Sequence, residues 1–230
     1  MLWLAVALLI VAILIWWLLI RTEGVFLGRG MVIWLYDLYA KRYDNIVQHD
    51  DVEEHLHLAI PLMTRIAPNV SPLILDVATG TGRMPLALCQ HARFEGTIIG
   101  LDASVGMLKQ AISKIDENHF EDYVTFLQGD GLSLPFPNNH FDIVTCMEAL
   151  EFMPDPEQGL RELVRVLRPS GLLLTTRRIH EPLMLNRQWS QPKMLKTLQA
   201  FGMTNVAFEA WQYDYEKVWA VKPTKPLNLQ

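Results

Sequence analysis

From Leu73 onward, short apolar runs alternate with longer segments in which apolar residues recur every three or four positions. The runs predict buried strands at Leu73–Val77, Thr97–Leu101, Tyr123–Leu127, Phe141–Cys146 and Leu172–Thr176. The longer segments predict amphipathic helices, one of which carries on a single face Leu108, Ala111, Ile112 and Ile115. Strands that alternate with such helices imply βαβ units and a parallel sheet covered on both faces.

Polar residues mark where two of these helices begin. Ser104 is a typical N-cap, and Asp155 followed by Pro156 predicts an N-cap and a first helical residue. The helix after Pro156 is expected to bury Leu160, Leu163, Val164 and Leu167.

The C-terminal pattern is different. After a helix near Pro192–Phe201, two further strands are predicted at Thr204–Tyr213 and Glu216–Val221. The connection between them is too short for a parallel crossover, so they form an antiparallel hairpin. Lys222–Gln230 is a polar tail.

The N-terminal segment Leu2–Ile20 is apolar without interruption. As a helix it would be about 28 Å long, which matches the hydrocarbon thickness of a bilayer. A cleaved signal peptide is the alternative. However, no Lys or Arg precedes the run, the run is longer than an ordinary signal core, and no small-residue cleavage site follows. The pattern therefore predicts an uncleaved membrane anchor.

Positive charge lies on the C-terminal side of this segment, at Arg21, Arg29, Lys41 and Arg42. By the positive-inside rule, the body of the protein is expected in the cytoplasm, with Trp16 and Trp17 as interfacial residues. Val25–Tyr43 is aromatic but too interrupted to span a membrane, so it either lies along the interface or packs on the globular domain. A further helix is predicted over Val52–Arg65, where His55 and His57 face different sides and predict no metal site.

Composition narrows the classes of partner. With 230 residues, half of them apolar, the chain can build one sizeable core. A net charge of -5 and the lack of a basic stripe argue against nucleic acid. Cys89 and Cys146 lie in apolar stretches without metal-ligand spacing, so we expect two reduced core residues and no metal ion.

Candidate chemistry lies just after the predicted strands, where ligands of open α/β sheets bind. Asp76 ends the first strand and is followed by Ala78, Thr79, Gly80 and Gly82, a turn that lets a ligand approach bare backbone. Asp102 ends the second strand and can accept hydrogen bonds from ribose hydroxyls.

Asp130 and Gly131 follow the third strand, and Met147, Glu148 and Glu151 follow the fourth. Any one acid could be a helix cap or a turn residue, but three at successive strand ends indicate a nucleotide-like cofactor.

The segments LDVATGTG, GLDASVGML, GDGLSLPFPNNHFDIVTCMEALEFMPDP and LVRVLRPSGLLL resemble consecutive motifs of class I S-adenosylmethionine-dependent methyltransferases. The resemblance covers roughly Leu73–Thr176. It implies a Rossmann-like, mostly parallel sheet of seven strands with an antiparallel last strand, and S-adenosylmethionine as cofactor. Together with the apolar N-terminal segment and the polar tail, this predicts an anchor (1–21), interfacial or lid helices (22–70), a methyltransferase domain (71–222) and a tail (223–230).

The same resemblance implies residue roles. The loop from Asp76 to Gly82 would hold the methionine part of the cofactor, Asp102 the ribose, and Asp130 with Gly131 the adenine. Met107 would pack against the base, and Ala103 and Met147 are further candidates for cofactor contact. WLYDLYAKRYD is similar to the N-terminal motif of the quinone-type branch, so Tyr36 and Tyr43 are candidate lid residues.

The likeness leaves the methyl acceptor open, because MEALEF stands where the quinone enzymes carry a different motif. Glu148, Glu151 and His180 are candidate general bases, with Glu148 ranked first. The anchor and the aromatic lid suggest a lipophilic acceptor, such as a quinone precursor or a phospholipid head group.

Two other classes of function share parts of this pattern. A nicotinamide-dependent oxidoreductase would share the glycine turn, but Pro85 occupies the third glycine position of that fingerprint. A membrane-tethered, non-catalytic cofactor binder is the alternative that remains, because no catalytic residue is assured.

Overall fold

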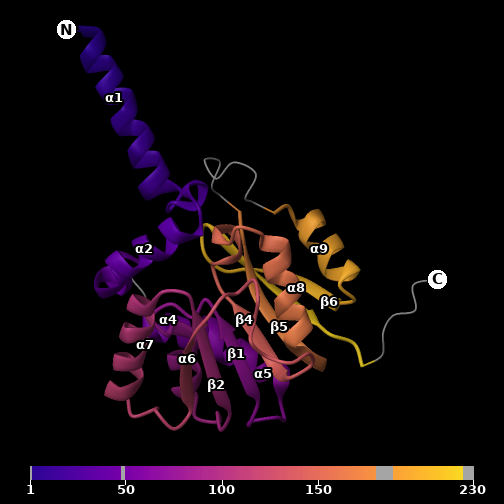
Figure 1. Cartoon of the computed structure of the whole chain (residues 1–230). Coiled ribbons are helices and arrows are strands. Elements are labelled where there is room, and N and C mark those ends of the chain that lie inside the picture. Colours follow the sequence, from indigo (N-terminus) through magenta and orange to yellow (C-terminus); the bar gives the residue numbers. More distant parts are fainter. Residues whose placement is uncertain (1, 48–49, 180–188, 225–230) are drawn as a thin grey trace.

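A computed structural model describes residues 2–47, 50–179 and 189–224 (Figure 1). Within these residues, seven strands form one sheet in the order β3-β2-β1-β4-β5-β7-β6. Their bounds are β1 (Leu73–Val77), β2 (Thr97–Asp102), β3 (Val124–Gln128), β4 (Phe141–Cys146), β5 (Leu167–Arg178), β6 (Thr204–Ala210) and β7 (Tyr215–Val221). Strands β1 to β5 are mutually parallel, and β7 runs antiparallel to both β5 and β6. The predicted parallel sheet and C-terminal hairpin are therefore confirmed.

Helices cover both faces, as the alternating pattern predicted. One face carries α8 (Pro156–Val166) and α9 (Gln191–Ala200), and the other carries α5 (Ile60–Ile66), α6 (Arg83–Cys89) and α7 (Val105–Glu117). Each face has its own apolar cluster. In β1, Leu75 packs into the first cluster and its neighbour Ile74 into the second, because successive side chains of a strand point to opposite faces.

The predicted helix caps are present. The Ser104 hydroxyl accepts a hydrogen bond from Met107 N (3.1 Å), and the Asp155 carboxylate accepts one from Gln158 N (3.0 Å). These bonds satisfy amide groups that have no partner within the helix.

Two predicted boundaries were wrong. Leu167 was expected on the helix, but α8 ends at Val166 and Leu167 begins β5, where it pairs with Phe141. The register then shifts before Ile143 pairs with Leu172. Strand β5 therefore begins at Leu167, five residues before the predicted start at Leu172, with an irregular first part. At the other end of the sheet, β6 stops at Ala210 rather than Tyr213, because Gln212 and Tyr215 exchange backbone hydrogen bonds that close the hairpin.

The N-terminal helix α1 (Leu2–Trp16) continues through a π-helical turn at Trp17–Arg21. None of the α1 residues is buried, and α1 projects away from the globular domain (Figure 1). Leu2–Arg21 is long and apolar enough to cross a bilayer, as a membrane anchor or a signal sequence would be.

The segment after α1 folds back over the sheet. It contains α2 (Arg29–Tyr39), a 3₁₀ turn and α3 (Tyr43–Val47), which together we call the lid. The Asp37 carboxylate accepts hydrogen bonds from Ser104 Oγ (2.6 Å) and Gly106 N (2.7 Å). Asp44 pairs with Lys114 Nζ at 2.6 Å. Of the two alternatives for this segment, packing on the globular domain is therefore observed.

The predicted helix over Val52–Arg65 is present in three consecutive parts, namely α4 (Asp51–Glu54), a π-helical turn (His55–Ala59) and α5. Asp50 caps its start by accepting a hydrogen bond from Val52 N at 2.8 Å. His55 stacks on His91 with ring centroids 5.5 Å apart.

Candidate active site

Two adjoining cavities lie where the parallel strands end. The inner cavity encloses about 830 Å³, including space open to solvent, and is lined by the residues after β1, β2, β3 and β4 and by α2. The outer cavity encloses about 1380 Å³ on the same basis and lies between the end of the apolar helix, the lid and the β6–β7 turn. Residues that line both cavities join them into one site, and they are Tyr36, Tyr43, Glu148 and Phe152.

The glycine turn after β1 forms one wall of the inner cavity. Ala78 and Gly80 both have a φ of 57°, and Gly80 N donates a hydrogen bond to Asp102 Oδ2 at 2.9 Å. A Cβ atom on Gly80 would meet nothing within 4 Å, so the left-handed backbone, rather than crowding, favours glycine there. The turn leaves bare backbone facing the cavity.

Asp102 lies at the end of β2, as predicted, and lines the inner cavity beside Ala103. Its carboxylate also accepts a hydrogen bond from Ser104 N at 2.8 Å, which fixes its orientation. Burial raises the pKa of Asp102, and the backbone hydrogen bonds from Ser104 and Gly80 oppose that rise. Since a carboxylate has about four lone-pair sites, these bonds leave acceptor capacity for a ligand.

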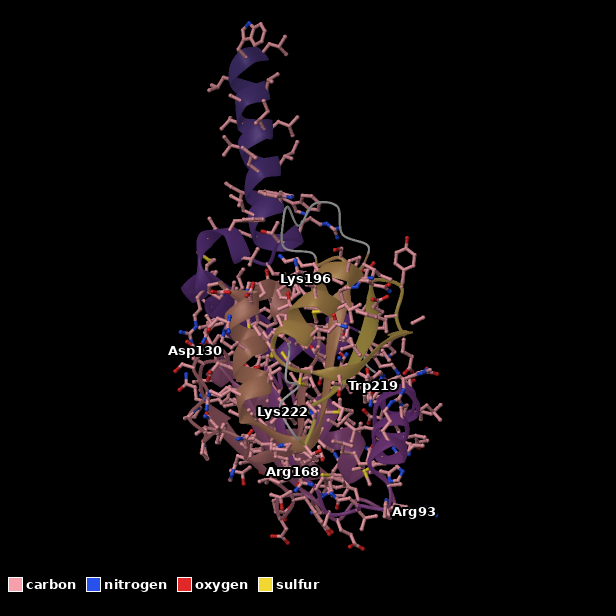
Figure 2. All side chains as sticks on the ribbon, turned by 90° about the vertical axis from the view of Figure 1, so that its right-hand side faces the viewer. Arg93, Asp130, Arg168, Lys196, Trp219 and Lys222 are labelled. Carbon is pink, nitrogen blue, oxygen red and sulfur yellow. The ribbon has the colours of Figure 1, made fainter. Side chains whose placement is uncertain are left out.

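Asp130 and Gly131 line the inner cavity after β3. One Asp130 oxygen accepts from Leu132 N (2.9 Å) and the other pairs with Arg29 Nη1 (2.8 Å) at the start of α2. Figure 2 shows Asp130 on the same side of the domain as α2. From the sequence, Arg29 counted only among the positive charges that follow the apolar segment, and this contact was missed, because no local pattern relates positions so far apart in the chain.

Asp76 and Thr79 line a smaller pocket that continues from the inner cavity past Ala78 and Gly80 to Arg83. The Asp76 carboxylate accepts a hydrogen bond from the Thr145 hydroxyl at 2.6 Å. Burial raises the pKa of Asp76 from 3.8 to about 6, against the lowering effect of that hydrogen bond. A buried carboxyl in this position would be stabilised in its charged form by a cationic ligand.

Two predicted cofactor residues lie behind the cavity wall. Met107 is 1% exposed within the first turn of α7, and Gly82 packs against α7, where a Cβ atom would come within 3.2 Å of Ala111 Cβ. Neither residue lines the inner cavity, whereas the predicted Met147 does.

The two candidate catalytic acids have different surroundings. Glu148 lines both cavities, has a φ of 49°, and accepts hydrogen bonds from Arg83 Nη2 (2.8 Å) and Gln212 Nε2 (3.3 Å). Glu151 is buried outside both cavities and accepts from the Tyr215 hydroxyl at 2.5 Å. Burial raises the pKa of Glu151 to about 7. The third candidate, His180, lies outside the described residues.

The lid closes the site with aromatic rings. Tyr36 and Tyr43 have ring centroids 5.9 Å apart, and Tyr36 meets Phe152 edge-on at 6.4 Å. The Tyr36 hydroxyl donates to Glu23 Oε2 at 2.5 Å. Glu23 was missed by sequence reasoning, although an acid directly after an apolar span is a signal that could have been noticed.

This arrangement fits a nucleoside that carries a positively charged group. Asp102 and Asp130 present carboxylates to hydroxyl and amino groups, while Leu101, Leu132 and Met153 supply apolar lining. Among the described residues, no three His, Cys, Asp or Glu side chains are grouped as metal ligands.

Comparisons with known proteins agree with this geometry. A family described as a methyltransferase domain matches residues 75–175. The chain is 35% identical over 183 residues to a demethylmenaquinone methyltransferase of Lactiplantibacillus plantarum, covering 79% of this chain and 76% of that one. For a protein of the same name from Desulfitobacterium hafniense the identity is 29%, covering 65% of this chain and 60% of that one.

The fold is similar to that of a solved S-adenosylmethionine-dependent methyltransferase from Aquifex aeolicus. The TM-score is 0.64 at 20% identity, and the alignment covers 81% of this chain and 98% of that one. Taken with the sheet order and the residues at the strand ends, these likenesses show that the chain belongs to the class I S-adenosylmethionine-dependent methyltransferases, with S-adenosylmethionine as its cofactor.

Proposed function

We propose that this methyltransferase acts at the cytoplasmic face of a membrane on a lipophilic, quinone-type acceptor. The observation that carries the proposal is the outer cavity. It is lined by Leu19 and Ile20, the last apolar residues of the N-terminal helix, and it shares Glu148 with the inner cavity. An acceptor leaving the bilayer beside the helix would therefore reach the reacting end of the cofactor without crossing bulk water.

The orientation of the domain supports this route. Figure 2 labels Arg93 and Arg168 at the end of the domain opposite the N-terminal helix, and β5 runs from that end toward the helix. The carboxyl ends of the parallel strands thus face the proposed membrane. On the lid, Trp34 (55% exposed) and Leu38 (59% exposed) present apolar surface that a membrane interface would cover.

The relatives suggest the class of acceptor, because their name describes methylation of a demethylated menaquinone. The apolar tail of such a molecule would lie against Ile20, Ile46 and Val47, with its ring toward Glu148. A ring carbon of an oxidised quinone is electron-poor, so we expect the reduced, hydroxylated ring to be the nucleophile.

For the cofactor, we propose that the loop through Ala78, Thr79, Gly80 and Gly82 holds the methionine part, with Asp76 behind it. Asp102 and Ala103 would bind the ribose, Asp130 and Gly131 the adenine, and Met107 and Met147 would support the base. Tyr36 and Tyr43 would close over the bound molecule.

When bound, the cofactor supplies a methyl group on a positively charged sulfur, which is already a good leaving group. The protein therefore has mainly to align the acceptor and exclude water. We propose that residues 1–21 anchor the chain, 22–70 form the lid and its supports, 71–222 form the methyltransferase domain and 223–230 a tail.

The test is an assay of full-length protein in lipid vesicles with methyl-labelled cofactor. Label is expected in the organic extract when a prenylated 1,4-dihydroxynaphthalene, kept reduced, is the acceptor. Label confined to water-soluble products would overturn the proposal.

A non-catalytic cofactor binder is the competing function, and it is disfavoured by the second cavity adjoining the cofactor site. The variant Asp102→Ala separates the two, because a cellular phenotype that survives loss of cofactor binding would support the non-catalytic role.

A further inference from the structure

The turn that follows the apolar helix directs a carboxylate into the outer cavity. Gly24 N and the Thr22 hydroxyl both donate to Leu18 O at 2.9 Å, which holds the turn against the helix end. Between them, Glu23 has a φ of 49°. A left-handed backbone costs a residue with a side chain about 1–2 kcal/mol, and such strain is concentrated at functional sites.

The Glu23 side chain is half-buried and lines the outer cavity. Its Oε2 atom accepts a hydrogen bond from the Tyr36 hydroxyl at 2.5 Å, and Tyr36 lines both cavities. Glu23 is thus a carboxylate of the outer cavity that contacts Tyr36, one of the residues joining this cavity to the cofactor site.

The other two acids of the site are less suited to receive a proton. Glu148 is paired with the Arg83 guanidinium at 2.8 Å, which stabilises its charge. Glu151 is buried outside both cavities against the Tyr215 hydroxyl. An acceptor in the outer cavity would meet the Glu23 carboxylate directly, beside the Arg178 side chain that lines the same cavity.

Resting on the hydroxylated acceptor of the proposed function, we propose that Glu23 is the catalytic proton acceptor and that Tyr36 positions its carboxylate. The acceptor O–H bond breaks and its proton passes to Glu23, which increases electron density on the ring carbon. The new C–C bond forms as the C–S bond of the cofactor breaks, and sulfur keeps that electron pair. The ring C–H proton then leaves to water while Glu23 returns its proton to the oxygen, so one proton is released overall.

The electrostatic setting supports this role. Burial raises the pKa of Glu23 from its ordinary value of 4.5, and the Glu148 charge adds to the rise. The hydrogen bond from Tyr36 and the Arg178 charge oppose it. Tyr43 of the lid also interacts electrostatically with Glu23, and Tyr39 lines the same cavity. A carboxylate with a raised pKa is a stronger base than an ordinary carboxylate.

The first test uses full-length protein in anionic lipid vesicles with the prenylated 1,4-dihydroxynaphthalene as the probe. Glu23→Gln should lower kcat about 100-fold with little change in KM. We expect the wild-type rate to rise with pH as Glu23 loses its proton, and the variant should lack this rise. Glu23→Asp should recover part of the rate. Glu121→Gln makes the same chemical change at an exposed residue outside both cavities and should have no effect.

Acceptor acidity distinguishes a base from a merely structural residue. A ring-fluorinated probe, whose hydroxyl is largely ionised at the assay pH, needs no base, so the Glu23→Gln defect should shrink at least tenfold. A defect of equal size on both probes would overturn the role of Glu23.

Binding without turnover supplies an independent readout. Cofactor-free wild type should bind the diol about tenfold more tightly than its dimethyl ether, which has no proton to donate, and Glu23→Leu should abolish that preference. If the wild type and Glu23→Leu preferred the diol over its dimethyl ether to the same extent, the proposal would be overturned.

If the wild type fails to methylate the probe, the proposed function falls and this inference with it. If the wild type is active and Glu23→Gln keeps at least half its rate, only the assignment of Glu23 falls.

Discussion

The carboxyl groups at the strand ends differ in the hydrogen bonds and ion pairs that surround them. Asp102 accepts two backbone hydrogen bonds that hold it in the cavity wall. Asp76 lies behind the glycine turn with one hydroxyl partner at 2.6 Å. Glu148 is balanced by an arginine. These environments suit three different tasks. Asp102 can accept hydrogen bonds from a neutral ligand, and Asp76 can face a cationic group. Glu148 can organise the side of the site where the acceptor would react.

Asp102→Ala should raise the dissociation constant for S-adenosylmethionine about 10- to 100-fold. The change removes an ionic acceptor, whose hydrogen bonds contribute about 1.5–3 kcal/mol, and releases the amides of Gly80 and Ser104. Calorimetric titration measures the effect, with Asp116→Ala on the exposed side of α7 as the control. Equal affinity of Asp102→Ala and wild type would contradict the assignment.

Asp76→Asn should change how stability depends on pH. The Asp76 pKa is about 6 in the folded protein and 3.8 without its surroundings. The folded protein therefore binds this proton more tightly, and the resulting stabilisation is present below pH 4 and lost as pH rises through 6. Asparagine cannot ionise, so the variant should gain roughly 1–3 kcal/mol relative to wild type between pH 4 and pH 7.

Urea unfolding at a series of pH values measures that difference. Asp116→Asn, an exposed change, should give a curve parallel to wild type. A parallel curve for Asp76→Asn would show that Asp76 titrates normally in the folded protein.

At the scale of elements, the lid depends on a close approach between α2 and α7. A Cβ atom on Gly106 would lie 2.9 Å from Asp37 Cα and from its Oδ1 atom. The first turn of α7 thus accepts α2 only because glycine leaves that space free. Most of the strands and helix caps were predicted from local pattern, whereas this docking involves residues that are distant in the chain.

Gly106→Ala should displace the lid, although alanine favours helix formation by about 1 kcal/mol. Hydrogen exchange in α2 should become faster, and the affinity for S-adenosylmethionine should fall severalfold. Gly30→Ala lies in α2 itself, where a Cβ atom meets nothing within 4 Å, and should leave both properties unchanged or improved. Unaltered exchange in Gly106→Ala would show that the lid is held by other contacts.

At the scale of the whole molecule, the catalytic domain does not need the proposed anchor for its stability but would need it for its function. No α1 residue is buried, so the core does not depend on it. Its continuation, Trp17–Arg21, supplies Leu19 and Ile20 to the outer cavity. The anchor would therefore both hold the domain at the membrane and form part of the acceptor route.

Deletion of Leu2–Trp16 should move the protein from the membrane pellet to the supernatant with its affinity for S-adenosylmethionine unchanged. Turnover of an acceptor embedded in vesicles should fall at least tenfold, because the acceptor no longer meets the cavity at the bilayer. Sedimentation, calorimetry and the labelled-methyl assay measure the three properties. Full turnover by the deleted protein would contradict a membrane route for the acceptor.

The sequence alone determined most of the strands, the glycine turn and the positions of the acids Asp102 and Asp130 at strand ends, because each depends on residues close together in the chain. Periodicity of two or about 3.6 positions identifies buried faces, and glycine identifies left-handed turns. The start of β5 at Leu167 escaped this reasoning, since a polar, irregular strand edge is defined by its partner β4.

Only the tertiary structure decided which side chains share the site. It brought Glu23 and Arg29 from the N-terminal segment to the strand ends, and it placed Met107 and Glu151 behind the cavity walls. The physical reason is that burial, ion pairing and cavity shape arise from contacts between distant segments, which local sequence patterns do not encode.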